Sequence, residues 1–144
     1  MIEETLLLVE DDPQAVLLVR HTFKKRGFDV TVTVASDGAE ALQSLIGSAT
    51  EEPSCPKLPA VVLLDLDLPK VHGFEVLRRL RAHPRTQTLP IIILTADRDM
   101  DASLGYTLGA NSFLRKPLDF GAFSRALVGI GLGALGKPTT SKSN

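Results

Sequence analysis

The chain has 144 residues, and its 44% content of hydrophobic residues suits one domain with a sizeable buried core. Its formal net charge of −1 provides no overall attraction to nucleic acid, and no apolar run approaches the roughly 20 residues needed to cross a membrane. The first residues lack the basic segment and apolar stretch of a signal peptide, and Cys55 has no cysteine partner for an internal disulfide. We therefore expect a cytoplasmic protein without a nucleic-acid or membrane partner.

The N-terminal part of the chain predicts a strand, a helix and a second strand. The first strand is expected at residues 5–9, where four apolar residues follow one another. Asp12 is a suitable N-cap and Pro13 a suitable first residue for the helix that follows, and Gly27 provides its end. Residues 30–34 are rich in β-branched side chains and predict the second strand.

The middle of the chain predicts a helix, a long loop, a strand and a further helix. Ser36 can cap the first of these helices, whose apolar stripe consists of Ala41, Leu42, Leu45 and Ile46. Residues 47–59 contain three prolines and predict a loop of about 12 residues, which is long enough to carry a partner contact. A strand is then expected at residues 60–64 and a helix at residues 73–82. The basic residues of this helix are expected to face solvent: Arg78, Arg79 and Arg81.

The remaining part of the chain predicts two strands, each followed by a helix. After a strand at residues 91–94, a helix ends at Gly109. This helix carries three apolar residues four positions apart: Met100, Leu104 and Leu108. A short strand at residues 112–114 precedes a helix that Asp119 caps. The inner face of this last helix is expected to consist of Phe120, Phe123, Leu127 and Ile130.

The strands at residues 5–9, 60–64 and 91–94 are continuous apolar runs rather than alternating ones. Strands of this kind are covered by helices on both faces, as in parallel α/β sheets. Right-handed crossovers then produce a doubly wound sheet of five parallel strands. We expect this domain to occupy residues 1–131 and a flexible tail to occupy residues 132–144, where glycine and then polar residues dominate.

Polar side chains follow four of the five predicted strands. They are Glu10, Asp11 and Asp12 after the first strand, Asp65 after the third, Thr95 after the fourth and Lys116 after the fifth. Ligands bind at the carboxyl ends of the strands in an open parallel α/β sheet, so we expect these residues to share one cleft. Carboxylates, a hydroxyl and an ammonium together suit a divalent cation and a phosphoryl group.

Four short motifs occur at these strand ends: the acidic cluster after the first strand, Leu-Leu-Asp-Leu-Asp-Leu-Pro-Lys at residues 63–70, Leu-Thr-Ala at 94–96 and Lys-Pro at 116–117. In this order, over about residues 4–130, they resemble the receiver domain of two-component response regulators. The resemblance implies a flavodoxin-like fold with strand order 2-1-3-4-5 and a sensor histidine kinase as partner. The third strand and the loop before it are similar to single-domain regulators, without a DNA-binding output domain, that partner phytochrome-type histidine kinases.

The resemblance assigns the central chemistry to Asp65. It implies that the Asp65 carboxylate attacks the phosphorus of a kinase phosphohistidine and becomes an aspartyl phosphate. It also implies a Mg²⁺ site of Glu10, Asp11, Asp65 and Asp67. In this site Asp11 is a direct ligand, Glu10 acts from behind the direct ligands or through a bridging water, and Asp67 offers its backbone carbonyl. Asp12 is then a helix cap rather than a ligand. Such a protein is not a turnover enzyme, because it catalyses only its own phosphorylation and dephosphorylation.

The resemblance also implies roles for residues around the phosphorylation site. Lys116, with a cis bond to Pro117, pairs with a phosphoryl oxygen, and Thr95 donates its hydroxyl to the phosphoryl group. Phe113 stands at the family's aromatic switch position, although an ordinary core role suits it equally well. His72 stands where the family often has aspartate. Phosphorylation is expected to change the surface of the fourth helix, fifth strand and fifth helix, through which a homodimer can form.

Two other functions fit parts of the sequence. Asp65-Leu66-Asp67 also resembles the Asp-x-Asp motif of haloacid-dehalogenase-type phosphatases, which turn over phosphate esters. That motif normally opens its fold, whereas two strands precede it here, and no acidic pair follows Lys116. A receiver fold used only as a binding module is the second alternative. The full set of site residues argues against it, because a binding module has no need of Asp65 or Lys116.

Overall fold

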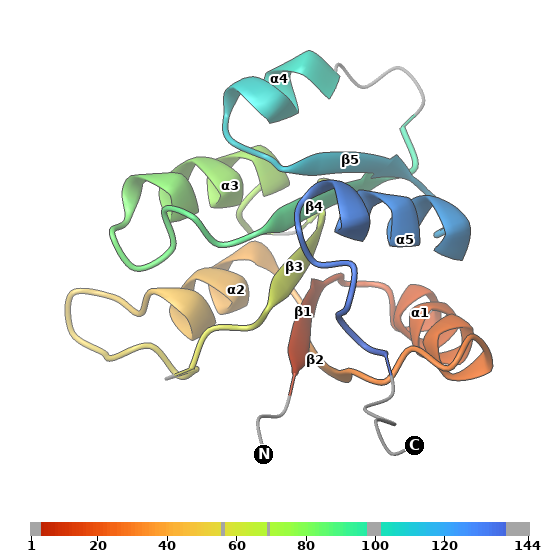
Figure 1. Ribbon diagram of the computed structural model, residues 1–144. Coiled ribbons are helices and arrows are strands. Elements are labelled where there is room, and N and C mark those ends of the chain that lie inside the picture. The colour runs from red at the N-terminus through yellow and green to blue at the C-terminus, as the bar shows by residue number, and fades with distance from the viewer. Residues whose placement is uncertain (1–3, 56, 69, 98–101, 138–144) are drawn as a thin grey trace.

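The computed structural model describes residues 4–55, 57–68, 70–97 and 102–137. Five parallel strands form one sheet in the order β2-β1-β3-β4-β5 (Figure 1). The strands are β1 (Thr5–Val9), β2 (Thr31–Ala35), β3 (Val61–Asp65), β4 (Ile91–Thr95) and β5 (Ser112–Arg115). The predicted fold class and strand order are therefore confirmed.

Helices cover both faces of the sheet, as the apolar strands predicted. The helices are α1 (Pro13–Lys25), α2 (Gly38–Leu45), α3 (Gly73–Ala82), α4 (Ala102–Thr107) and α5 (Phe120–Gly129). Helices α1 and α5 pack on one face and α2 and α3 on the other, while α4 lies beside β5 at one edge (Figure 1). The chain is thus a doubly wound α/β domain.

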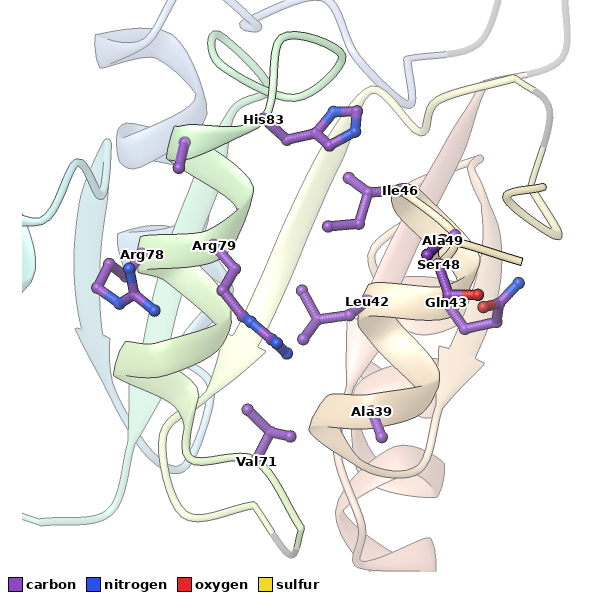
Figure 2. A pocket seen from close by; sticks show the side chains of 12 residues that line it. Ala39, Leu42, Gln43, Ile46, Ser48, Ala49, Val71, Arg78, Arg79 and His83 are labelled. Carbon is purple, nitrogen blue, oxygen red and sulfur yellow. The ribbon is translucent and has the colours of Figure 1, made fainter. Parts of the chain in front are cut away.

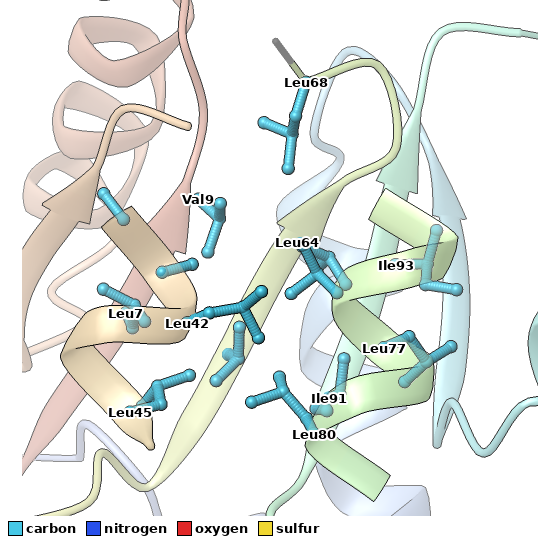
Figure 3. Packing of buried hydrophobic residues seen from close by; sticks show 14 of the residues in the cluster. Leu7, Val9, Leu42, Leu45, Leu64, Leu68, Leu77, Leu80, Ile91 and Ile93 are labelled. Carbon is cyan, nitrogen blue, oxygen red and sulfur yellow. The ribbon is translucent and has the colours of Figure 1, made fainter. Parts of the chain in front are cut away.

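Two apolar clusters hold the helices to the sheet because neighbouring strand residues point to opposite faces. In β3, Leu64 packs with α2 and α3, whereas Leu63 packs with α1 and α5. Figure 3 shows strand residues such as Leu64 and Ile93 facing Leu42 of α2 and Leu77 of α3. All residues of β3 and β4 are buried. Each fully buried leucine or isoleucine contributes about 1.5–3 kcal/mol, so these two strands form a rigid base for whatever follows them.

Two helix starts show how far capping patterns could be predicted. Asp12 caps α1 as predicted, since its carboxylate accepts the Gln14 backbone N–H at 3.0 Å. The prediction that Ser36 caps α2 was wrong by one residue: Asp37 accepts the Glu40 N–H at 2.7 Å, and Glu40 in turn accepts the Ser36 N–H. Asp37 is the better N-cap because its ionised carboxylate also interacts favourably with the helix dipole.

The described part of α4 is Ala102–Thr107, and one of the three predicted apolar residues, Leu108, follows it and packs against the core cluster. Met100 lies outside the described residues, and Leu104 is 44% exposed rather than facing the core. Gly105 is the buried position, where an added Cβ would lie 3.0 Å from Ile93 and 3.4 Å from Phe113. A residue without a side chain therefore lets α4 approach the sheet closely, while Leu104 remains on the surface.

Arg81 is not the solvent-facing residue that the sequence predicted. Its guanidinium donates hydrogen bonds to the carbonyls of Gly109 and Thr86 and to the side-chain oxygen of Asn111, at 2.8–2.9 Å. The arginine therefore links the end of α3 to the turn between α4 and β5. Arg78, by contrast, is exposed as predicted and pairs with Glu75.

The packed structure extends to residue 137 rather than ending at Gly131. Leu135 is only 5% exposed and joins the cluster under α1 and α5. The Gly136 N–H donates to the Glu4 carboxylate at 2.9 Å, and the Gly136 carbonyl accepts the Asp29 N–H at 2.7 Å. Residues 138–144 of the predicted tail lie outside the described residues. Among the described helices, none has the length and hydropathy to cross a membrane.

Candidate functional site at the carboxyl ends of the strands

The register of the sheet brings the predicted site residues to one edge. Val9 pairs with Leu64, so Glu10 and Asp65 follow at the same level on neighbouring strands. Asp65 pairs with Leu94, directly before Thr95, which in turn pairs with the residue before Lys116. Side chains that are far apart in sequence therefore meet at the carboxyl ends of four adjacent strands, as expected for this fold.

Three carboxylates gather at this edge. Glu10, Asp11 and Asp65 each offer an oxygen atom, and these atoms lie within 4.8 Å of one another. Glu10 and Asp65 are only 3% and 4% exposed, whereas Asp11 is exposed. Like charges at such separations repel strongly when water is excluded, so the cluster needs a cation. A compact, oxygen-only donor set that is open to solvent on one side fits Mg²⁺, which keeps several of its waters.

Asp67 has a different position from the three clustered acids. Its side chain is exposed, and its backbone N–H donates to the Asp65 carboxylate at 3.2 Å. The geometry thus brings together three of the four predicted metal residues by their side chains: Glu10, Asp11 and Asp65. The carbonyl role of Asp67, and the division between direct and water-mediated ligands, stay predictions.

Lys116 supplies a positive charge inside the acidic cluster. Its ammonium lies 2.7 Å from the Glu10 carboxylate and 3.2 Å from the Asp65 carboxylate. The Lys116–Pro117 peptide bond is cis, as the resemblance implied. Burial would lower the pKa of Lys116, but the hydrogen bond to Glu10 and the charges of Asp65 and Glu10 raise it above its ordinary value. The ammonium therefore stays protonated and available to an anionic ligand.

The Asp65 carboxylate is held in an unfavourable charged state when no metal ion is bound. Burial, and secondly the nearby charge of Glu10, raise its pKa from the ordinary value of 3.8 to about 6. Lys116 and the Asp67 N–H oppose that rise without cancelling it. A carboxylate that is poorly solvated and aimed at a cation site is a suitable nucleophile for an electrophilic phosphorus atom.

Thr95 and Phe113, the two predicted switch residues, lie on the neighbouring strands β4 and β5. Thr95 is fully buried, and its hydroxyl accepts the Asp97 N–H at 3.1 Å. Phe113 is half-buried against the cluster under α3, and the Arg115 guanidinium lies 5.0 Å from its ring centre. A cation over an aromatic face is attractive, so Arg115 covers the outer side of this ring. Whether Phe113 turns on phosphorylation, or is an ordinary core residue, stays a prediction.

Two residues at the start of α3, His72 and Gly73, have structural roles beside Asp65 that the sequence analysis did not predict. An added Cβ at Gly73 would lie 2.7 Å from the Asp65 carbonyl and 2.6 Å from the Leu66 Cα, so only glycine fits there. His72 caps α3 by accepting the Phe74 N–H on its ring nitrogen at 3.1 Å. Histidine thus takes over the capping that aspartate commonly performs. The sequence did contain one indication of this close approach, because a glycine is an unfavourable first residue for the helix predicted at residues 73–82.

Comparisons with known proteins agree with this geometry. A family model described as "Response regulator receiver domain" matches residues 6–127. The chain is 37% identical over 123 residues to "Probable methanogenesis regulatory protein FilR2" of Methanothrix harundinacea, covering 85% of this chain and 77% of that protein. Several other curated relatives are transcriptional regulators, and the chain spans less than half of their length.

Two solved structures share the fold and the arrangement of elements. The bacteriophytochrome response regulator AtBRR has a TM-score of 0.79 and 37% identity, with 92% of this chain and 95% of that chain covered. The Mn²⁺-bound form of the response regulator Rcp1 has a TM-score of 0.71 and 28% identity, with 91% and 92% covered. The second structure is a relative in which a divalent metal ion is bound.

Proposed function

The chain belongs to the response regulator receiver domain family, and from this premise we propose that Asp65 accepts a phosphoryl group from a sensor histidine kinase in a Mg²⁺-dependent reaction. The single observation that carries the proposal is the position of Asp65. Its buried carboxylate lies beside Glu10 and Asp11 and 3.2 Å from the Lys116 ammonium. One site thus contains a nucleophile, a cluster of acids that can bind a metal ion, and an ammonium group that can pair with an anion.

The transfer is a displacement at phosphorus. An oxygen of Asp65 forms the new bond to phosphorus, while the bond between phosphorus and the imidazole nitrogen of the kinase phosphohistidine breaks. The bonding electrons leave with the imidazole, which becomes neutral histidine after protonation. The product is a mixed anhydride of a carboxylate and phosphate. The buried strand β3 holds the attacking oxygen, and the contacts of Lys116 with Glu10 and Asp65 hold its ammonium beside that oxygen.

Glu10, Asp11, Asp65 and the backbone carbonyl of Asp67 would hold Mg²⁺. When bound, the ion neutralises the acids and stabilises negative charge on the phosphoryl oxygens. Lys116 contacts Glu10 at 2.7 Å and Asp65 at 3.2 Å. Because an arriving phosphoryl group competes with these carboxylates, the ammonium can turn to a phosphoryl oxygen without leaving the cleft.

Phosphorylation acts on the rest of the protein through Thr95 and Phe113. The Thr95 hydroxyl accepts one backbone hydrogen bond and can donate another to a phosphoryl oxygen. Movement of Thr95 frees space beside β4, into which the half-buried Phe113 ring can turn. The surface of α4, β5 and α5 changes as a result, and the signal passes by protein–protein contact, including homodimer formation.

A phytochrome-type histidine kinase is the proposed partner. The support is the 37% identity and near-complete mutual coverage with the bacteriophytochrome response regulator AtBRR. The protein then works as a signalling component that is modified once and slowly reset, rather than as an enzyme that turns over a free substrate.

Incubation with Mg²⁺ and acetyl phosphate, followed by intact mass, tests the proposed chemistry. We expect the mass of one added phosphoryl group with Mg²⁺, none with a chelator and none in Asp65→Asn. Asp67→Asn is the matched control, because it removes a neighbouring exposed acid. An unchanged adduct in Asp65→Asn would move the site elsewhere. Continuous release of phosphate without an adduct would instead indicate a phosphatase.

A further inference from the structure

A groove of about 540 Å³ runs between α2 and α3 on the outer surface of these two helices. Its apolar floor consists of Leu42 of α2, Ile46 directly after α2, and Val71 before α3. Figure 2 shows Leu42 and Ile46 pointing across the space toward α3. The rest of the lining consists of small residues, which leave the groove open: Ala39, Gly47, Ser48, Ala49 and Ala82.

The wall formed by α3 is positively charged. Arg79 extends from α3 into the groove toward Leu42 (Figure 2), and its side chain is 51% exposed. Glu75 pairs with Arg78 at 2.6 Å and with the Arg79 Nε at 3.5 Å, so two arginines and one acid leave one net positive charge. Among the described lining residues of the groove there is no aspartate or glutamate, so Arg78 and Arg79 are its charged side chains. Glu51 and Glu52 line the adjoining hollow, which shares Ile46, Ser48, Ala49 and His83 with the groove.

One end of the groove is tied to the loop that follows the phosphorylation site. Val71 packs so closely on the start of α2 that an added Cβ at Gly38 would lie 2.3 Å from its carbonyl oxygen. In the same loop, Lys70 forms an ion pair with Asp37 at 3.3 Å. These contacts hold Val71 in place in the groove floor. An occupant of the groove would thus touch the loop that begins at Asp65.

We propose that this groove binds an acidic amphipathic helix of a protein partner. An apolar floor beside an exposed arginine matches a helix with leucine-like side chains on one face and Asp or Glu next to them, the recognition mode in which a helix lies in a groove. Arginine is also a frequent energetic anchor at interfaces. Helices α2 and α3, with eight and ten residues, are about 12 and 15 Å long, which suits two to three turns of such a helix.

A synthetic helix tests the proposal with unphosphorylated protein, so its outcome is independent of the chemistry at Asp65. The probe is a fluorescein-labelled peptide of about four turns, with Leu at positions i, i+3, i+4 and i+7 and Glu elsewhere. Fluorescence anisotropy should show saturable binding that weakens as salt is added. A peptide of the same composition with its apolar stripe scrambled, and one with Lys in place of Glu, should bind at least about tenfold more weakly.

Variants locate the binding face. Arg79→Glu should weaken binding about tenfold, Arg79→Lys should retain part of the affinity, and Ala39→Met should weaken it by filling the groove. Arg20→Glu is the matched control, because Arg20 is an exposed arginine of α1 on the opposite face of the sheet. No saturable binding, equal binding of the scrambled peptide, or equal affinity of Arg79→Glu and Arg20→Glu would each overturn the proposal.

Discussion

Asp65→Asn should stabilise the metal-free protein at neutral pH, although it removes the proposed nucleophile. The pKa of Asp65 rises from 3.8 to about 6 on folding, chiefly through burial and secondly through the charge of Glu10. That rise already includes the attraction of Lys116, which opposes it. At about 1.4 kcal/mol for each pKa unit, the charged carboxylate costs the folded state about 3 kcal/mol.

The cost depends on pH in a defined direction. Well below pH 3.8 the carboxyl group is neutral in both the folded and unfolded states, so it carries no charge penalty, and near pH 4 only a small part of the penalty applies. As pH rises toward 6 the unfolded state loses its proton first, and the folded state is progressively destabilised relative to it. Above about pH 6 the full penalty applies. Asparagine resembles the neutral acid at every pH, so the difference in stability between variant and wild type should grow from near zero to about 3 kcal/mol.

Urea unfolding with a chelator present measures this difference. Unfolding of wild type and Asp65→Asn is monitored by circular dichroism. The free energies of unfolding of the two proteins are then compared near pH 4 and near pH 7.5. Asp67→Asn is the control and should change stability by no more than about 0.5 kcal/mol, because its side chain is exposed. If Asp65→Asn is no more stable than wild type near pH 7.5, or if its advantage is equally large near pH 4, the account of a strained carboxylate is wrong. Added Mg²⁺ should stabilise the wild type by binding only the folded state, and should stabilise Asp65→Asn much less.

Three further predictions concern residues that support the fold and the site. Truncation after Gly131 removes the buried Leu135 and the hydrogen bonds of Gly136, so the free energy of unfolding should fall by about 2–4 kcal/mol; a fall below about 0.5 kcal/mol would show that this packing contributes nothing. Gly73→Ala places a Cβ 2.7 Å from the Asp65 carbonyl, so both the melting temperature and the rate of phosphorylation by acetyl phosphate should fall, and an unaffected rate would contradict a positioning role. Arg81→Met keeps the aliphatic stem but loses three hydrogen bonds, which should cost about 1–3 kcal/mol in urea unfolding, whereas an unchanged midpoint would mean that the link to Asn111 and the α4–β5 turn is not stabilising.

The strand ends were predictable because two independent signals agree there. Continuous apolar runs predict buried parallel strands, and polar residues directly after them predict a site at one edge of the sheet. Glu10, Asp65, Thr95 and Lys116 therefore meet as expected, and Asp11 lies beside them. The local sequence was sufficient to predict this cluster, because the position of each residue depends only on where its own strand ends.

Features that depend on distant partners could not be predicted in the same way. Leu135 lies in a glycine-rich segment that resembles a flexible tail, and it is ordered by a cluster built from α1, α5 and the sheet. Arg81 lies in a basic run that predicts a solvent-exposed side chain, but its hydrogen-bond partners are on a turn about 30 positions away. At the start of α2, Ser36 and Asp37 are both good capping residues, so propensity alone could not decide between them.

The central claim is that Asp65 carries the phosphoryl group, and chemical trapping tests it most directly. Borohydride reduces an aspartyl phosphate to homoserine, which peptide mass spectrometry locates within the sequence. After treatment with Mg²⁺ and acetyl phosphate, the account predicts homoserine at position 65 and at no other aspartate. Homoserine at position 11 or 67, with Asp65 unmodified, would contradict it.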